Sequence, residues 1–147
     1  MKAVLPETVA QVGAQAVLAN AYHLYLQPGS DLVDEAGGLG RFMNWPGPTF
    51  TDSGGFQVMS LGAGFKKVIE MDAKRASSDE AVAPGKERLA HVDDDGVTFK
   101  SHLDGMKHRF TPEVSMRVQH ELGADIMFAF DELTHLHNTR EYQESSL

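Results

Sequence analysis

Short apolar runs, each followed directly by polar residues, recur along the chain. Runs of this length, bounded by turn-forming residues, are typical of buried strands. Three such segments are AVLA, GPTFT and DIMFAF, at residues 16–19, 47–51 and 125–130. They end at Asn20, Asp52 and Asp131. The pattern therefore predicts three strands, each with a polar side chain at its carboxyl end.

Helical patterns precede the first two of these runs. Residues 7–12 predict the end of a helix that stops at Gly13. Ser30 is predicted to be the N-cap of a short helix that ends at a glycine pair.

The segment before the third run has a strong helix start. Thr111 suits the N-cap, Pro112 the first helical position and Glu113 the acidic first turn, and the helix is predicted to run to Gly123. A similar helix-to-strand pattern occurs twice, as VGAQAVLANAYHL and LGADIMFAFDELT. Repeated units of this kind predict an α/β fold with a parallel sheet. The carboxyl edge of such a sheet is where sites are built.

The segment between the second and third runs has a different character. Residues 62–95 are charged and contain scattered Ser, Pro and Gly, so they predict an insertion that is helical near residues 65–74 and loop-like afterwards. GVTFKSHLDGMKHRFT follows and predicts a β-hairpin with Asp104 and Gly105 at its turn.

Composition and charge narrow the classes of protein. The 147 residues are 41% hydrophobic and 23% charged, as in an ordinary globular domain. No apolar stretch approaches the roughly 20 residues of a membrane span, and the start MKAVLPETVAQ has no signal-peptide core, so we expect a cytoplasmic protein. A net charge of −8 opposes nucleic-acid binding unless positive charge is clustered locally.

The stretch from Asp52 to Phe56 has two interpretations. In one it is a turn with a capped helix behind it. In the other, Gly54 and Gly55 let a flat ligand approach the backbone beside Asp52 and Ser53, and Phe56 supplies a stacking face. Spacing alone does not decide between them.

Asp131 and the histidines also have alternative interpretations. Asp131 is either a helix N-cap or a carboxylate that accepts two hydrogen bonds from an amide-like ligand edge. Asn20 alone carries little weight, because amides at strand ends usually satisfy backbone groups. His135 and His137 do not have the spacing of a helical ligand pair, and the chain has no cysteine. We therefore expect no metal site and no disulfide within this chain.

Five segments follow one another as in bacterial tRNA-guanine transglycosylases. They are LANAYHLYLQPG, GGLGRFMNWPGP, TDSGGFQVMSL, GVTFKSHLDGMKHRFTPEVSMRVQHELGAD and AFDE. The resemblance covers nearly the whole chain. Members of that family are (β/α)₈ barrels with a zinc-binding subdomain near the C-terminus. The resemblance therefore implies part of a TIM barrel, incomplete in this chain, with parallel strands and an inserted hairpin.

The resemblance also implies a reaction. These enzymes exchange guanine at the wobble position of certain tRNA anticodons for 7-aminomethyl-7-deazaguanine, on the way to queuosine. One aspartate attacks the ribose and forms a covalent RNA–enzyme intermediate, as in retaining glycosyl transfer. A second transfers the proton on the glycosidic nitrogen of the departing or entering base. The target base is turned out of the anticodon loop into a pocket.

Matching positions give expected roles in this sequence. Asp52 resembles the proton-transfer aspartate, and Asn20 resembles the residue that helps to hold it. Asp131 resembles the residue that reads the guanine amidine edge, where a carboxylate accepts from both the ring N–H and the exocyclic amine. The residues that resemble the wall and stacking face of the base pocket are Ser53, Gly54, Gly55 and Phe56.

This sequence also departs from the family pattern. Ala21 stands where the family usually has Thr, Leu133 where many members have Cys, and the insertion at residues 62–95 is longer. The resemblance places the nucleophilic aspartate and the zinc site beyond Leu147, so this chain, expected to be about the first half of the enzyme, is predicted to be inactive alone. When full length, the protein is expected to form a homodimer.

Two alternatives remain open at this stage. One is a truncated, non-catalytic module that binds a 7-deazaguanine or a partner subunit. The other is the archaeal-type transglycosylase, which inserts a different deazaguanine at another tRNA position. The NWPGP segment and the SHLDG turn favour the bacterial type.

Overall fold

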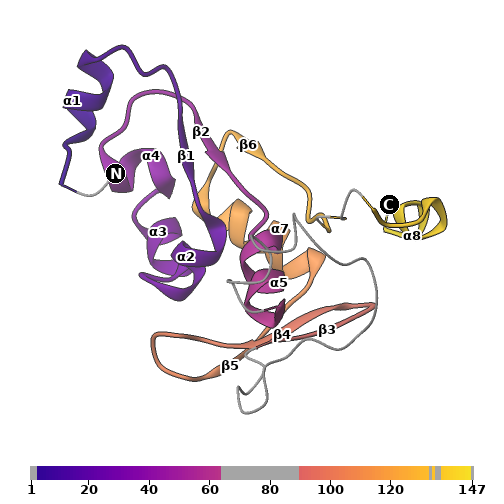
Figure 1. The fold of residues 1–147 in the computed structure, drawn as a ribbon. Helices are drawn as coiled ribbons and strands as arrows, with labels where there is room; N and C mark the ends of the chain where they lie inside the picture. The colour runs from indigo at the N-terminus through magenta and orange to yellow at the C-terminus, as the bar shows by residue number, and fades with distance from the viewer. Residues whose placement is uncertain (1–2, 64–89, 133, 135–136, 147) are drawn as a thin grey trace. The chain divides into compact units, whose positions relative to one another are not determined.

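The computed structural model describes residues 3–63, 90–132, 134 and 137–146. The chain forms two compact units (Figure 1). Unit 1 comprises Met1–Gly54 and Pro112–Phe130, and unit 2 comprises Gly55–Thr111 and Asp131–Leu147. The helix predicted near residues 65–74 and the position of Leu133 lie outside the described residues.

Unit 1 contains the predicted parallel sheet. Its strands are β1 (Val17–Ala19), β2 (Thr49–Thr51) and β6 (Ile126–Met127), in the order β1-β2-β6. Both pairings are parallel, with Leu18 opposite Phe50 and Phe50 opposite Ile126. The prediction of an α/β fold with a parallel sheet is confirmed. The described strands form two separate three-stranded sheets and no closed barrel.

Five helices accompany this sheet in unit 1. They are α1 (Pro6–Gln11), α2 (Ala21–Leu26), α3 (Ser30–Glu35), α4 (Gly38–Met43) and α7 (Pro112–Leu122). Side chains from α2, α3, α4 and α7 form the core, with Ala21, Val33, Leu39, Val118 and Leu122 almost fully buried. Ala19 and Met127 pack against this core, so the helices cover one face of the sheet.

The predicted helices of unit 1 are largely confirmed. Residues 7–12 were expected to end a helix, and α1 ends at Gln11. The helix start at Pro112 is found as predicted, with Glu113 in the first turn of α7. The prediction for Ser30 was wrong, because Gly29 occupies the N-cap position and Ser30 is the first residue of α3. The buried Ser30 hydroxyl instead donates a hydrogen bond to Glu121 Oε2 at 2.5 Å.

The prediction of a buried strand at residues 125–130 was wrong in length and in burial. Only Ile126 and Met127 are in β6, and Ile126 and Phe128 are about half exposed. Alternate side chains of a strand point to opposite faces of a sheet. Met127 faces the helices, so its two neighbours face the opposite side of the sheet.

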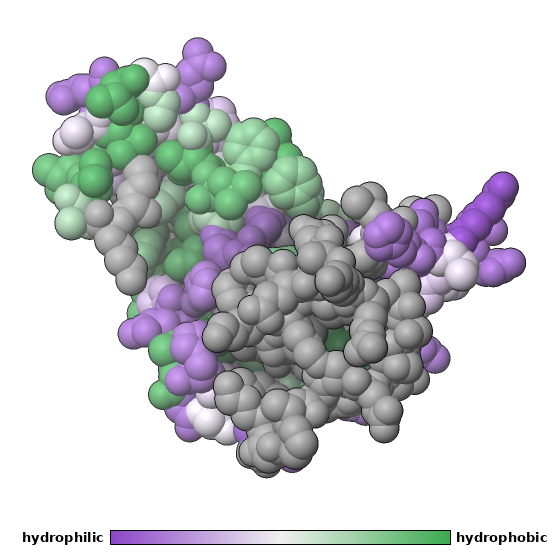
Figure 2. Space-filling model, viewed as in Figure 1, coloured by the Kyte–Doolittle hydropathy of each residue, from purple (hydrophilic) through white to green (hydrophobic). Residues whose placement is uncertain are grey.

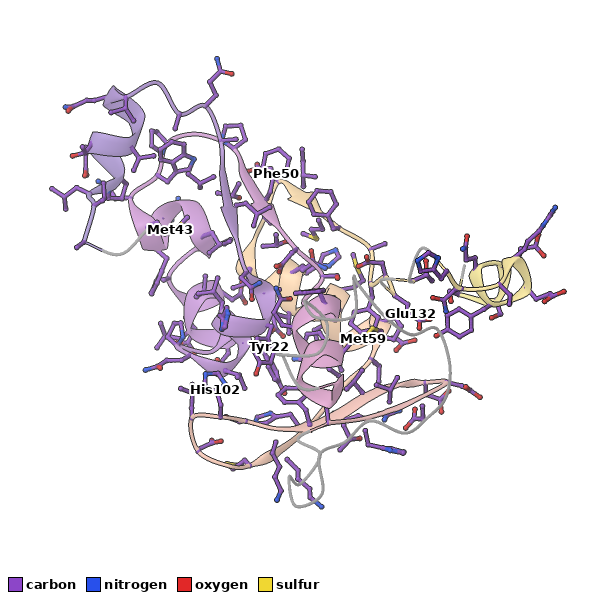
Figure 3. All side chains as sticks on the ribbon, in the orientation of Figure 1. Tyr22, Met43, Phe50, Met59, His102 and Glu132 are labelled. Carbon is purple, nitrogen blue, oxygen red and sulfur yellow. The ribbon has the colours of Figure 1, made fainter. Side chains whose placement is uncertain are left out.

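The face of the unit 1 sheet opposite the helices carries an apolar row. Leu18, Phe50 and Ile126 are aligned across its three strands. Leu18 is 62% exposed and Ile126 is 45% exposed. Figure 2 shows hydrophobic residues gathered over this part of unit 1, and Figure 3 labels Phe50 on β2.

Unit 2 contains an antiparallel sheet. Its strands are β3 (Ala90–Asp93), β4 (Gly96–Lys100) and β5 (Lys107–Phe110), in the order β3-β4-β5. The predicted hairpin is confirmed as β4 and β5, and Gly105 at its turn has φ +73°. Residues 90–93, predicted to be loop, form a strand because Ala90 pairs with Phe99 and Val92 with Val97.

Two of the described helices belong to unit 2. The first, α5 (Gly55–Ala63), contacts β3 and β4, and the second, α8 (Arg140–Ser145), follows the last described loop. The buried residues of the hairpin include Val97, Phe99 and Phe110. Across the described parts of both units, every helix is too short or too polar to cross a lipid bilayer.

Candidate active site

Asp52 follows β2 directly and is half-buried in unit 1. The backbone N–H of Ala21 donates a hydrogen bond to Asp52 Oδ1 at 2.8 Å. The Asn20 side-chain amide donates a hydrogen bond to Asp52 Oδ2, and the Gly54 N–H also donates to the carboxylate. These donors come from the ends of two neighbouring parallel strands, β1 and β2. The structure therefore brings together two of the polar strand ends expected from the sequence.

The helix start after β1 determines the orientation of the Asn20 amide. Asn20 is the N-cap of α2, and its Oδ1 accepts a hydrogen bond from the His23 N–H at 2.9 Å. Because the amide oxygen is occupied by the helix, the NH₂ group is directed towards Asp52. The hydrogen bond to Asp52 thus follows from the local fold of residues 20–23.

Burial raises the pKa of the Asp52 carboxyl above its ordinary value. The three N–H donors and the charge of His23 act in the opposite direction, but burial has the larger effect. All three donors are neutral. A carboxyl group with a raised pKa and neutral partners can take up and release a proton, which is the property required of a general acid and base.

The backbone after Asp52 turns sharply. Ser53 is buried, and its carbonyl oxygen accepts a hydrogen bond of 2.6 Å from the Ser115 hydroxyl. Gly54 is also buried and has φ +75°, a conformation that residues with a Cβ rarely adopt. Asp52, Ser53 and Gly54 therefore form a tightly constrained segment at the sheet edge.

The structure bears on both interpretations of this segment. Helix α5 does begin at Gly55, so a turn leads into a helix as one interpretation expects. The Asp52 carboxylate, however, also binds Asn20 and Ala21, more than 30 positions earlier in the chain. A helix cap does not require these long-range hydrogen bonds to the carboxylate, so they favour the interpretation of this segment as a candidate functional site.

The other candidate residues belong to unit 2. Gly55 is the first residue of α5, Phe56 is 43% exposed, and Asp131 is exposed on the loop that precedes α8. The first described helix after Asp131 is α8, whose N-cap is Thr139, so Asp131 caps no described helix. The roles of Gly55, Phe56 and Asp131 in a base pocket remain predictions.

Glu132, next to Asp131, binds helix α8. The Tyr142 hydroxyl donates a hydrogen bond to Glu132 Oε1, and the Ser146 hydroxyl donates to Oε2 at 2.9 Å. The Glu132 carboxylate raises the pKa of Tyr142. Figure 3 labels Glu132 on the segment between β6 and α8. Among the described residues, no group of three or more His, Asp or Glu side chains could hold a metal ion.

Two residues near Asp52 were missed in the sequence. Ser115 and Gln119 lie on α7 and bind the residues on either side of Asp52. The sequence does contain a sign of their role: they are polar residues one helical turn apart, on the face of α7 that also carries Val118 and Leu122. The sequence alone does not show that this face is the buried one.

These features define an α/β protein with a candidate acid/base carboxyl at the carboxyl edge of a parallel sheet. A family model described as queuine tRNA-ribosyltransferase matches residues 1–147, and the chain belongs to this family. The resemblance to tRNA-guanine transglycosylases is thereby confirmed.

Three curated relatives, each called queuine tRNA-ribosyltransferase, align with the whole chain. Those of Roseiflexus sp. (strain RS-1), Herpetosiphon aurantiacus and Desulforamulus reducens are 47%, 46% and 46% identical over 147 residues. The aligned region is 35%, 31% and 33% of their respective lengths. The chain therefore spans about a third of the length of these relatives, less than the half expected from the sequence.

Proposed function

We propose that this chain is the acid/base and base-binding part of a tRNA-guanine transglycosylase. The longer protein would exchange guanine in a tRNA anticodon for 7-aminomethyl-7-deazaguanine. The observation that carries the proposal is the half-buried Asp52 carboxyl, which is held by neutral donors at the carboxyl edge of the sheet. Membership of the queuine tRNA-ribosyltransferase family supports the same reaction.

In this proposal Asp52 acts twice during one exchange. As an acid, it gives its proton to the glycosidic nitrogen of the departing guanine while the bond to the ribose carbon breaks. As a base, it then takes the proton from the corresponding nitrogen of the incoming deazaguanine as the new bond forms. The carboxyl is therefore returned to its starting state.

The remaining candidates bind the base in this proposal. Ser53, Gly54 and Gly55 form the wall of the base pocket, and Phe56 stacks on the purine. Asp131 accepts hydrogen bonds from the ring N–H and the exocyclic amine. Adenine lacks this pair of donors and would leave the carboxylate without partners, so the site would reject it.

The carboxylate that attacks the ribose and the zinc-binding residues are assigned to parts of the protein outside these 147 residues. This agrees with the length of the relatives, of which the chain spans about a third. The described residues do not fit a zinc site, because no suitable set of ligands comes together. A partial (β/α)₈ barrel is consistent with the parallel sheet and its helices.

The direct test is Asp52→Asn in the full-length protein. The amide has the shape of the carboxyl but cannot transfer the proton, so base exchange should fall by about 10²–10⁴-fold. Exchange of radiolabelled guanine into tRNA measures this. The melting temperature and tRNA binding serve as controls for folding. An unchanged exchange rate would exclude Asp52 as the acid and base.

A non-catalytic base-binding module is a second candidate, because the Asp52 carboxyl and its Asn20 and Ala21 donors all come together within this chain. Calorimetric titration of the 147-residue chain with guanine, and with adenine as control, tests it. Guanine binding that is lost in Asp131→Ala would show that this chain alone forms the base site.

A further inference from the structure

Helix α7 buries two polar side chains beneath Asp52. Ser115 and Gln119 are both completely buried and lie four residues apart, on the same face of the helix. Burying a polar group without a hydrogen bond costs free energy, so the partners of these two side chains indicate their role.

Gln119 links three parts of unit 1. Its Oε1 accepts a hydrogen bond from the Thr51 hydroxyl at 2.8 Å. Its Nε2 donates to the Phe128 carbonyl oxygen at 2.9 Å and to the Ser115 hydroxyl oxygen at 3.3 Å. Thr51 is the last residue of β2, and Phe128 follows β6. One amide therefore ties together the carboxyl ends of two parallel strands.

Ser115 completes the arrangement on the other side of Asp52. Its hydroxyl donates to the Ser53 carbonyl oxygen at 2.6 Å. The residues immediately before and after Asp52 are thus each held by α7, Thr51 by its side chain and Ser53 by its backbone. Thr51 and Ser53 are themselves buried, so these bonds are shielded from water.

We propose that Gln119 and Ser115 are positioning residues that fix the direction of the Asp52 carboxyl for proton transfer. The proposal rests on the proposed function of Asp52. Gln119 and Ser115 act on Asp52 through its two chain neighbours, Thr51 and Ser53. The carboxyl is then fixed from two directions, by Asn20 and Ala21 at its oxygens and by α7 at its backbone.

The neutrality of this network supports a positioning role. An arginine or lysine at position 119 could also bind the strand ends, but its charge would lower the pKa of a nearby carboxyl. An amide and a hydroxyl hold the backbone without adding charge. The remaining buried face of α7 is apolar, with Val118 and Leu122, so packing alone requires no polar group at either position.

The test uses Gln119→Met and Ser115→Ala in the full-length protein. Both remove the hydrogen bonds with little change in volume. We expect kcat for base exchange to fall about 10-fold to 100-fold, which corresponds to about 1.4–2.8 kcal/mol, while KM for tRNA changes less than 2-fold. A loosened segment admits water to Asp52 and lowers its pKa. Because Asp52 must start protonated to act as the acid, the basic limb of the pH–rate profile should move to lower pH.

Val118→Ala is the matched control. Val118 is also completely buried on α7, but it packs in the core cluster and makes none of the network hydrogen bonds. This variant should lower the melting temperature and leave both kcat per folded enzyme and the pH profile unchanged. Thr51→Val removes one of the Gln119 hydrogen bonds from the opposite side and should reproduce part of the effect of Gln119→Met.

The outcomes separate the two proposals. If Asp52→Asn lacks activity while Ser115→Ala and Thr51→Val keep the normal kcat and pH profile, only the positioning proposal is overturned. If Val118→Ala changes the pH profile as much as Ser115→Ala does, the network is merely structural. If Asp52→Asn is fully active, the proposed function itself is wrong.

Discussion

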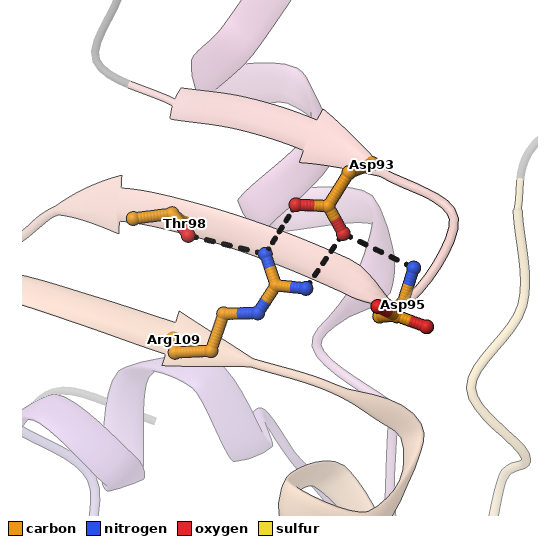
Figure 4. A network of polar contacts seen from close by, with 4 residues as sticks. All are labelled: Asp93, Asp95, Thr98 and Arg109. Carbon is orange, nitrogen blue, oxygen red and sulfur yellow. Dashed lines mark hydrogen bonds and ion pairs between the residues drawn. The ribbon is translucent and has the colours of Figure 1, made fainter.

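The end of β2 in unit 1 and the tip of the sheet in unit 2 each hold an aspartate by several hydrogen bonds, yet the two carboxyl groups differ in acidity. The pKa of Asp52 is raised, mainly by burial. The pKa of Asp93 is lowered to about 2, mainly by hydrogen bonds from Arg109. Figure 4 shows the paired contacts of the Arg109 guanidinium with both Asp93 oxygens, at 2.7 and 2.6 Å.

The difference shows that the pKa of a carboxyl group depends more on the charge of its partner and on the access of water than on the number of its hydrogen bonds. Asp93 is exposed, and its partner is a cation that also binds Thr98, so the carboxylate stays ionised and closes the turn. Asp52 has only neutral donors and less water around it. Of the two, only Asp52 has a pKa shifted in the direction that favours uptake of a proton.

Among the variants that test this contrast between Asp52 and Asp93, the largest loss of activity is expected when a second carboxyl is placed beside Asp52. Asn20→Asp keeps an oxygen that can cap α2 but replaces the amide donor with a carboxylate. The two acids should share one proton, so the pKa of the pair rises further. We expect base exchange by the full-length protein to fall by about 10²-fold or more at neutral pH.

The same variant should have a characteristic dependence of stability on pH. Because the folded pKa of the pair is raised above its unfolded value, stability is retained below the unfolded value and is lost as pH rises through the folded pKa. Asn20→Ser, which keeps a cap without the second charge, is the control. A melting temperature of Asn20→Asp that does not fall between pH 4 and 8 would contradict this account.

The edge that carries Asp52 could be predicted from the sequence because its signals are local. Short apolar runs ending in Asn20 and Asp52 predicted two parallel strands, and both are found. The start of α7 at Pro112 was predicted from three consecutive residues. Each of these features depends on a few neighbouring side chains, as does the β4–β5 hairpin.

Features that depend on distant contacts could not be predicted. Ser30 has the residue type of an N-cap, but its hydroxyl binds Glu121, 91 positions away. Gln119 binds Thr51, 68 positions away, and no local pattern indicates that pairing. The apolar residues of β6 did not show which face of the sheet is covered, so the exposure of Ile126 was missed.

The sheets of the two units differ in how their faces are covered. This difference predicts a smaller effect, on the binding of an apolar dye. In unit 2, α5 contacts β3 and β4, whereas in unit 1 Leu18, Phe50 and Ile126 form the exposed apolar row. Exposed rows of this kind bind apolar dyes and promote association. The double variant Leu18→Thr, Ile126→Thr of the 147-residue chain should bind anilinonaphthalene sulfonate several-fold less. Val92→Thr, an exposed position in β3, is the control and should leave dye binding unchanged.

The smallest effect is expected at the exposed ion pair of unit 2. Arg109→Met removes the cation, so the pKa of Asp93 should return from about 2 towards its ordinary value of 3.8. Because the folded pKa is lowered, the contribution of the pair to stability is present above the ordinary value and is lost as pH falls through about 2. Carboxyl chemical shifts measured against pH test this directly, and a change in melting temperature at pH 7 should be barely detectable because both side chains are exposed.

Lys107→Met is the control for Arg109→Met. It removes an exposed charge from the same strand without touching Asp93 and should leave the Asp93 titration unchanged. If Asp93 still titrates near 2 in Arg109→Met, the turn N–H groups rather than the cation set its acidity, and the contrast with Asp52 would rest on burial alone.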